Sequence, residues 1–208
     1  MKRFVFLIAA FMAVFAFVAH AAQDLETAGK VKRIKGSAVA VQNANVRPLK
    51  VGDEVLIGDI LSTGSESRLE ITMIDDGSFK LGEKTSFVVI DYNFGHGHDN
   101  AILELLNGVM DGASGQIAKA NPDGMKVLTK HGTIGIRGTK FFVGEMDDKL
   151  HVAHWSGGGV HVKNHGGEVF LGEDNHGTTL THDHKAPTVP EKWDGELSDR
   201  AKALVHHE

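Results

Sequence analysis

The chain has 208 residues, with 22 Lys and Arg against 27 Asp and Glu, a formal net charge of −5, and no cysteine. This length suits one domain, or at most two small ones, with a sizeable core. The negative balance argues against a nucleic-acid partner, which would require a basic surface. The lack of cysteine excludes a disulfide scaffold, a thiolate zinc site and a cysteine nucleophile.

Residues 1–21 have the three-part pattern of a secretory signal peptide. Lys2 and Arg3 form a basic head, residues 4–18 are an unbroken apolar run, and Ala19-His20-Ala21 supplies small residues for cleavage. We expect cleavage after Ala21. A retained anchor is the alternative, but the run is shorter than the roughly 20 residues of a membrane span. We therefore predict a bacterial periplasmic or secreted protein with no retained span and no cytoplasmic segment.

Residues 22–180 are predicted to form one all-β domain. Leu69, Ile71 and Met73 alternate with polar residues, which is the period of a half-buried strand, and Asp75-Asp76-Gly77 is a hairpin turn signal. Turn signals recur about every 8–12 residues, as in an antiparallel β-sandwich or roll of many short strands. A parallel α/β fold is disfavoured because no long helical pattern separates the strands.

Two short helices are predicted. One covers residues 113–119 within the β domain. The other lies in a polar tail, residues 181–208, where Leu197, Ala201 and Leu204 form a helical stripe. Trp193 precedes this stripe, and we expect it to hold the tail against the domain.

A near-repeat, Val51-Gly52-Asp53 and Ile57-Gly58-Asp59, indicates two successive turns in which each aspartate bonds to the backbone. A calcium site would need several further oxygen ligands at fixed offsets, and the sequence does not arrange them so.

Three ordered stretches, residues 51–64, 67–86 and 127–143, resemble the FecR-domain family, and the resemblance runs from about residue 29 to 171. Its most diagnostic part is Arg137-Gly138-Thr139-Lys140-Phe141. The resemblance implies a bacterial, exported, all-β domain without known catalysis. In the best-known members, this domain relays a signal from an outer-membrane receptor, through a membrane span, to a cytoplasmic sigma-factor regulator. Without such a span, this chain is similar to the stand-alone exported members.

The family motif Arg137, Gly138, Thr139 and Phe141 has two interpretations. A guanidinium recognises carboxylates and phosphates, which would make Arg137 a binding residue. The favoured interpretation is structural: Gly138 permits a backbone conformation that a Cβ forbids, and Arg137 ties loops together by satisfying buried acceptors.

Histidine is frequent, and imidazole is a good ligand for divalent zinc, copper or nickel. Paired histidines occur at His96-Gly97-His98-Asp99, His151 and His154, His161 and His165, His182-Asp183-His184, and His206-His207. The candidate metal ligands are His96, His98, His151 and His161. The alternative is that these histidines are solvated side chains on turns and polar faces, since a zinc site requires three or four converging ligands.

One of these pairs depends on strand register. If residues 156–159 form a four-residue hairpin loop, His154 faces His161 across the ladder. If the loop has five residues, His151 and His161 share a face one pair apart. The hydrophobic pattern favours the second register.

No catalytic sequence motif appears, whether a nucleophile elbow, a phosphate-binding glycine loop or a metalloprotease helix. We predict a non-enzymatic module without a cofactor that binds an envelope protein or polymer, in signalling or as a scaffold. Histidine-mediated binding of a divalent transition metal is the alternative function.

Overall fold

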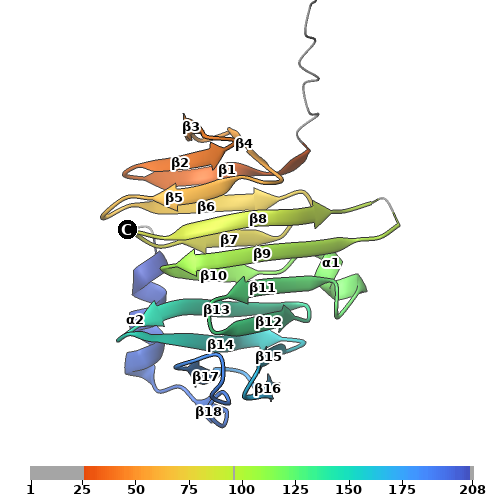
Figure 1. Ribbon diagram of the computed structural model, residues 1–208, viewed down its shortest axis with the longest axis vertical. Helices are drawn as coiled ribbons and strands as arrows, with labels where there is room; N and C mark the ends of the chain where they lie inside the picture. Colours follow the sequence, from red (N-terminus) through yellow and green to blue (C-terminus); the bar gives the residue numbers. More distant parts are fainter. Residues whose placement is uncertain (1–25, 96, 207–208) are drawn as a thin grey trace, which may run out of the picture.

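A computed structural model describes residues 26–95 and 97–206. Two nine-stranded sheets, sheet A and sheet B, face each other, and their strands run across the long axis of the molecule (Figure 1). The predicted all-β sandwich with a short C-terminal helix is confirmed.

Strands that are neighbours in space form each sheet in the following order. Sheet A consists of β18 (Glu191–Lys192), β17 (His176–Leu180), β14 (Lys149–Gly157), β13 (Thr139–Met146), β10 (Val109–Ala113), β7 (Ser78–Leu81), β6 (Arg68–Met73), β1 (Thr27–Lys35) and β4 (Glu54–Leu56). Sheet B consists of β16 (Gly167–Leu171), β15 (Val160–Asn164), β12 (Gly132–Ile136), β11 (Met125–Thr129), β9 (Asn100–Asn107), β8 (Ser86–Asn93), β5 (Ile60–Thr63), β2 (Ala38–Gln42) and β3 (Asn45–Pro48). The helices are α1 (Gln116–Ala120) and α2 (Gly195–Val205).

The chain builds the sandwich by passing between the two sheets as it advances from one end to the other, which the colour order of Figure 1 shows. Hairpin β6–β7 lies in sheet A, β8–β9 in sheet B, β11–β12 in sheet B and β13–β14 in sheet A. Between β9 and β11 the chain visits sheet A as β10. It therefore returns to sheet B beside β9 in the same direction, and this pair is parallel whereas the others are antiparallel.

The core lies between the sheets and follows the predicted alternation. Leu69, Ile71 and Met73 in β6 are all buried. Three phenylalanine rings pack at its centre, with Phe79 at 6.1 Å from Phe87 and 6.5 Å from Phe141 between centroids. These separations are typical of aromatic pairs in protein cores.

The predicted turns at the near-repeat are confirmed. Gly52 and Gly58 have φ angles of +92° and +90°, a region that favours glycine. The Asp53 carboxylate accepts a hydrogen bond from the Lys50 amide at 2.8 Å, and that of Asp59 accepts one from the Leu56 amide at 2.9 Å. Each aspartate closes its own turn.

The hairpin turn at Asp75 also holds helix α1. Asp75 is fully buried, and its carboxyl oxygens accept hydrogen bonds from the Tyr92 hydroxyl at 2.6 Å, the Gly77 amide at 3.0 Å and the Ile117 amide at 3.1 Å. One side chain therefore joins the β6–β7 turn, strand β8 and the start of α1. This helix was predicted over residues 113–119 and begins three residues later, at Gln116.

The Tyr92–Asp75 contact predicts a loss of stability at alkaline pH. Burial and the neighbouring Asp75 raise the pKa of Tyr92 above its usual value. A raised pKa in the fold means that stability is complete below about pH 10 and falls above it, by about 1.4 kcal/mol per pH unit. Tyr92 is the chain's one tyrosine, so phenolate absorbance during alkaline titration reports on it alone. We expect ionisation to coincide with unfolding, and Tyr92→Phe to remove this pH dependence. Ionisation of Tyr92 near pH 10 in the folded protein would show that its hydroxyl is not buried against Asp75.

The C-terminal helix packs on the outer face of sheet A. It begins at Asp194, whose side chain accepts a hydrogen bond from the Leu197 amide at 2.8 Å. A second apolar cluster forms between the helix and the sheet, composed of Val109, Phe142, Met146, Ala153, Trp193, Ala201 and Val205. Trp193 is 6% exposed, as expected for a residue that holds the tail to the domain.

One predicted pairing is wrong. Residues 156–159 do not close a hairpin, because β14 pairs with β13 and β17 in sheet A, whereas β15 pairs with β12 and β16 in sheet B. At this turn, the chain crosses from one sheet to the other. Neither predicted register of β14 against β15 therefore exists.

The predicted signal peptide, residues 1–21, lies outside the described residues. Within residues 26–95 and 97–206, neither helix has the length and apolar character required to cross a bilayer.

Candidate functional site

The outer face of sheet B carries an open groove of about 720 Å³. Strands β11, β12 and β15 lie side by side there, so that Lys126, Gly135 and His161 stand next to one another across the sheet. The alternate residues Val127, Ile134 and Val162 point into the core. Gly135 has no side chain to fill the floor, and the outward residues on either side become the walls.

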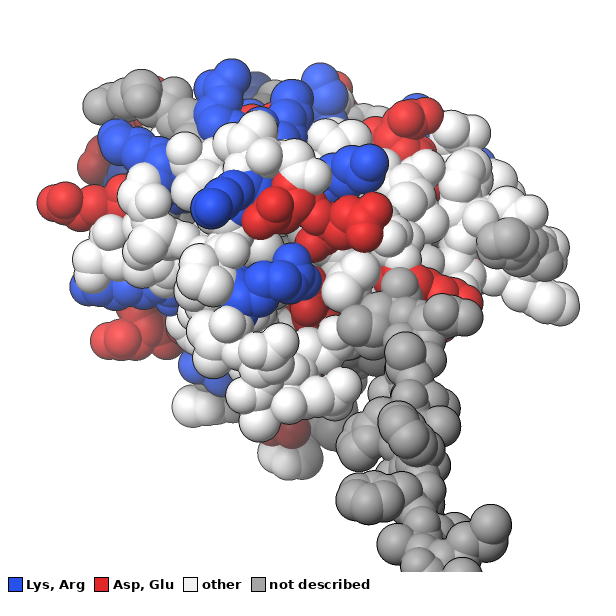
Figure 2. Space-filling model, turned by 90° about the horizontal axis from the view of Figure 1, so that it is seen from above, with Lys and Arg blue, Asp and Glu red and all other residues white. Residues whose placement is uncertain are grey.

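Basic side chains dominate the lining of this groove, which we call the basic groove. Four cationic residues line it, Lys126, Lys130, Arg137 and Lys163, against two carboxylates, Asp123 and Asp183. The end of the molecule seen in Figure 2 is different, since acidic and basic side chains are interspersed over much of it. The basic groove therefore departs from the negative balance of the whole chain.

The family motif divides between the core and the basic groove. Gly138 has a φ of +68°, and Phe141 is fully buried. Thr139 is 4% exposed; its amide donates to Ser114 Oγ at 2.8 Å, and its hydroxyl donates to the Ser156 carbonyl at 2.6 Å. The contacts of these three residues stabilise the fold, as their structural interpretation predicted.

Arg137 differs from the other motif residues. Its guanidinium lies 3.4 Å from the exposed carboxylate of Asp123 and 5.7 Å from the ring centre of Phe170, which is also exposed. An exposed ion pair contributes about 0–1 kcal/mol at most. Arg137 therefore does not meet the buried acceptors that its structural interpretation required, and its charge is available in the basic groove.

The structure separates the histidines proposed as metal ligands. His151 lies in β14 on sheet A, against the ring of Trp193, whereas His161 lies in β15 on sheet B, in the basic groove. The pairing of His154 with His161, expected for a four-residue loop, is wrong too, because His154 is buried and pairs with His176 of β17. His98 is exposed, and His96 lies outside the described residues.

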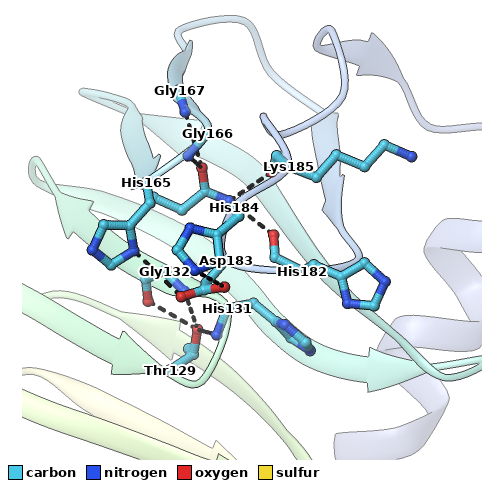
Figure 3. A network of polar contacts seen from close by, with 11 residues as sticks. Thr129, His131, Gly132, His165, Gly166, Gly167, His182, Asp183, His184 and Lys185 are labelled. Atoms are coloured by element: carbon cyan, nitrogen blue, oxygen red, sulfur yellow. Dashed lines mark hydrogen bonds and ion pairs between the residues drawn. The ribbon is translucent and has the colours of Figure 1, made fainter.

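A different set of histidines converges at one end of the basic groove. His165, Asp183 and His184 place potential ligand atoms within 4.8 Å of one another (Figure 3). The sequence showed His165 and the His182-Asp183-His184 run as two separate groups. Their proximity follows from the path of the tail, which returns to the β15–β16 turn after β17.

Burial shifts the pKa values of two groups on sheet A, away from the basic groove. Burial lowers the pKa of His151, and burial raises that of Asp111, although a hydrogen bond from Trp155 Nε1 at 2.7 Å opposes the increase. Both residues lie near the C-terminal helix on sheet A.

The fold and the basic groove define a class: a two-sheet, all-β domain with an open groove on the outer face of one sheet. The sequence profile of the FecR protein family matches residues 59–158, just under half of the chain, and this part of the chain is similar to a FecR domain. The match begins after the first turn of the near-repeat and ends within the turn that follows β14. It includes most of the floor of the basic groove but not β15 or the tail.

Two crystal structures of a protein from Parabacteroides distasonis ATCC 8503, provisionally described as an anti-sigma factor, have a similar fold. Each matches with a TM-score of 0.53 and 16% sequence identity, over 67% of this chain and 62% of the other. The present chain thus corresponds to somewhat less than two thirds of that protein. No curated protein matches the sequence.

Proposed function

We propose that this protein is a non-catalytic FecR-domain module that binds an acidic segment of an envelope protein in its basic groove. The observation that carries the proposal is the groove itself: four cationic side chains gather on an open sheet face of a chain whose net charge is negative. Complementary charge steers a partner to such a face and fixes its orientation.

A polypeptide suits this face better than a polysaccharide. Strand β16 forms the edge of sheet B beside the groove, and an extended peptide can add to such an edge through main-chain hydrogen bonds. Exposed Phe170 in this strand offers an apolar contact next to the cationic side chains. An anionic envelope polymer would use the charges but not the strand edge.

A binding role also agrees with the chemistry of the site. His151 and Asp111, whose pKa values are shifted by burial, lie near helix α2 on sheet A and do not line the groove, whereas enzymes usually gather such groups in one cleft. The family resemblance, which implies no known catalysis, supports the same conclusion. We propose signalling or scaffolding as the wider role, and the fold shared with a protein provisionally described as an anti-sigma factor supports signalling.

Export completes the proposal. The pattern of residues 1–21 supports removal of a signal peptide after Ala21, which leaves the domain in the periplasm or outside the cell. Removal of Lys2 and Arg3 leaves 20 basic and 27 acidic residues, a net charge of −7, so the basic groove becomes still more distinct from the rest of the chain.

Site-specific photocrosslinking in the producing cells tests this function. A photoreactive amino acid replaces Thr133, which lines the groove, or Lys50, which is exposed at the other end of the molecule. We expect an adduct from the Thr133 position alone, in a periplasmic or secreted protein that begins at Ala22. Mass spectrometry of the adduct should identify an acidic peptide.

Matched variants then locate the interaction. Lys126→Glu with Lys163→Glu reverses two groove charges, and Lys35→Glu with Lys50→Glu makes the same change in net charge elsewhere. We expect the first pair to reduce the adduct about tenfold or more and the second to leave it unchanged. Gly135→Val should also reduce it, since a Cβ there meets only His161 atoms at 3.7 Å and the added side chain fills the floor. Equal adducts from both probe positions, or a carbohydrate adduct, would overturn the proposal.

A further inference from the structure

We infer that His165, Asp183 and His184 form a binding site for a divalent transition-metal ion, with Zn²⁺ as the best-suited probe. This site differs from the histidine pairs that the sequence suggested, and it does not depend on a protein partner. Two segments build it: His165 comes from the β15–β16 turn, and Asp183 and His184 come from the segment after β17.

The distances fit zinc. The Asp183 carboxylate lies between the two imidazoles, with Oδ2 at 3.3 Å from His165 Nδ1 and Oδ1 at 3.5 Å from His184 Nε2. Ligand atoms about 2.0–2.2 Å from a tetrahedral zinc ion stand roughly 3.3–3.6 Å from one another. In this structure, one potential ligand atom from each of the three residues lies within 4.8 Å of the other two. The two rings lie 5.2 Å apart between centroids, so small side-chain rotations bring both nitrogens into range.

The backbone that carries these ligands is held by other groups. The Asn164 side-chain amide donates to the carbonyls of His182 at 3.2 Å and Lys185 at 2.8 Å, and its oxygen accepts from the Gly166 and Gly167 amides. The Gly166 amide also donates to the Asp183 carbonyl at 3.2 Å. Asn164 thus holds the tail against the turn. The two segments that carry the ligands are already close together before an ion binds, which lowers the entropic cost of binding.

Glycine makes this arrangement possible. A Cβ at Gly166 would lie 2.3 Å from the Ala186 amide nitrogen, which is closer than any real contact. The close approach of the two segments is therefore built into the backbone.

The ligand chemistry selects the class of ion. Imidazole nitrogens favour zinc, copper and nickel, and one carboxylate is compatible with each of them, whereas calcium and magnesium prefer oxygen ligands alone. The side chains of His165 and His184 are 74% and 80% exposed, so water can complete the coordination. The bound ion would fasten the tail to sheet B and add positive charge at the end of the basic groove, which His165 and Asp183 line.

Calorimetric titration of the metal-free protein with Zn²⁺ tests the site. We expect one equivalent to bind with a Kd of about 10 μM or tighter. His165→Ala, His184→Ala and Asp183→Asn should each weaken binding by about tenfold or more, and the double histidine variant should abolish it. All three residues are at the surface, so these variants are expected to fold.

His98→Ala is the matched control, because His98 is an exposed histidine on the loop between β8 and β9. It should bind Zn²⁺ as the unaltered protein does. With Cu²⁺ as a second probe, the paramagnetic spectrum should show two coordinating nitrogens, and the double variant should lose this signature. Absence of saturable binding tighter than about 10 μM, or binding that survives the double variant, would overturn the inference. Neither result bears on the photocrosslinking at Thr133, so the two proposals can fail independently.

Discussion

Asp75→Ala is expected to lower the free energy of unfolding by about 3–5 kcal/mol, because it leaves three buried donors without an acceptor. These donors are the Tyr92 hydroxyl and the amides of Gly77 and Ile117. A buried donor without a partner costs about 1–3 kcal/mol, and water entering the vacated space restores only part of the loss. Chemical denaturation monitored by circular dichroism measures the change.

The neighbouring residue supplies the control. Asp76 lies in the same turn, is exposed, and accepts one hydrogen bond from the Gln116 side chain. Its φ of +65° is tolerated by asparagine, so Asp76→Asn should change stability by no more than about 0.5 kcal/mol. Similar losses for Asp75→Ala and Asp76→Asn would show that Asp75 does not join the turn, strand β8 and helix α1.

Local sequence patterns predicted the strands well, because each pattern depends only on neighbouring residues. Leu69, Ile71 and Met73 alternate with polar residues whichever strand lies beside them, and burial of one face follows from that alternation. The Gly-Asp turns are equally local, since Asp53 and Asp59 each bond to an amide three residues earlier.

The same reasoning explains the wrong pairing of β14 with β15. Gly157 and Gly159 have positive φ angles, at +115° and +110°, so the turn signal was correctly detected. A turn that joins two strands of one sheet and a turn that crosses to the opposite sheet both need such residues. The distinguishing contact is the Gly158 amide donating to the Gly138 carbonyl at 3.1 Å, and it depends on a residue 20 positions away.

The two proposed sites also depend on contacts between residues that are far apart in the sequence. Lys126 and Lys163 line one groove because β12 pairs with both β11 and β15. His165 approaches Asp183 because Asn164 binds the tail. The sequence shows each residue but not the strand order that brings them together.

Trp193→Ala is the second substitution for which we expect a large effect. It should lower the free energy of unfolding by about 3–5 kcal/mol, as for other buried aromatic residues truncated to alanine. Trp193 joins the tail to the domain: its ring lies 5.6 Å from that of Trp155 and 6.2 Å from that of Phe142, between centroids. Without it, helix α2 retains only smaller apolar contacts with sheet A, through Ala201 and Val205 and the partly buried Leu197 and Leu204. An 11-residue helix is marginal by itself in water, so loss of docking should also unfold it.

Limited proteolysis and denaturation distinguish docking from general stability. We expect cleavage within residues 195–205 to become rapid in Trp193→Ala while the β domain stays intact. Gly177→Ala should reproduce the effect from the opposite side, because a Cβ there would lie 2.1 Å from Trp193 Nε1. Lys192→Ala, at the exposed neighbouring position, should leave both stability and cleavage unchanged. A helix that remains protected in both altered proteins would mean that its other contacts with sheet A suffice to hold it there.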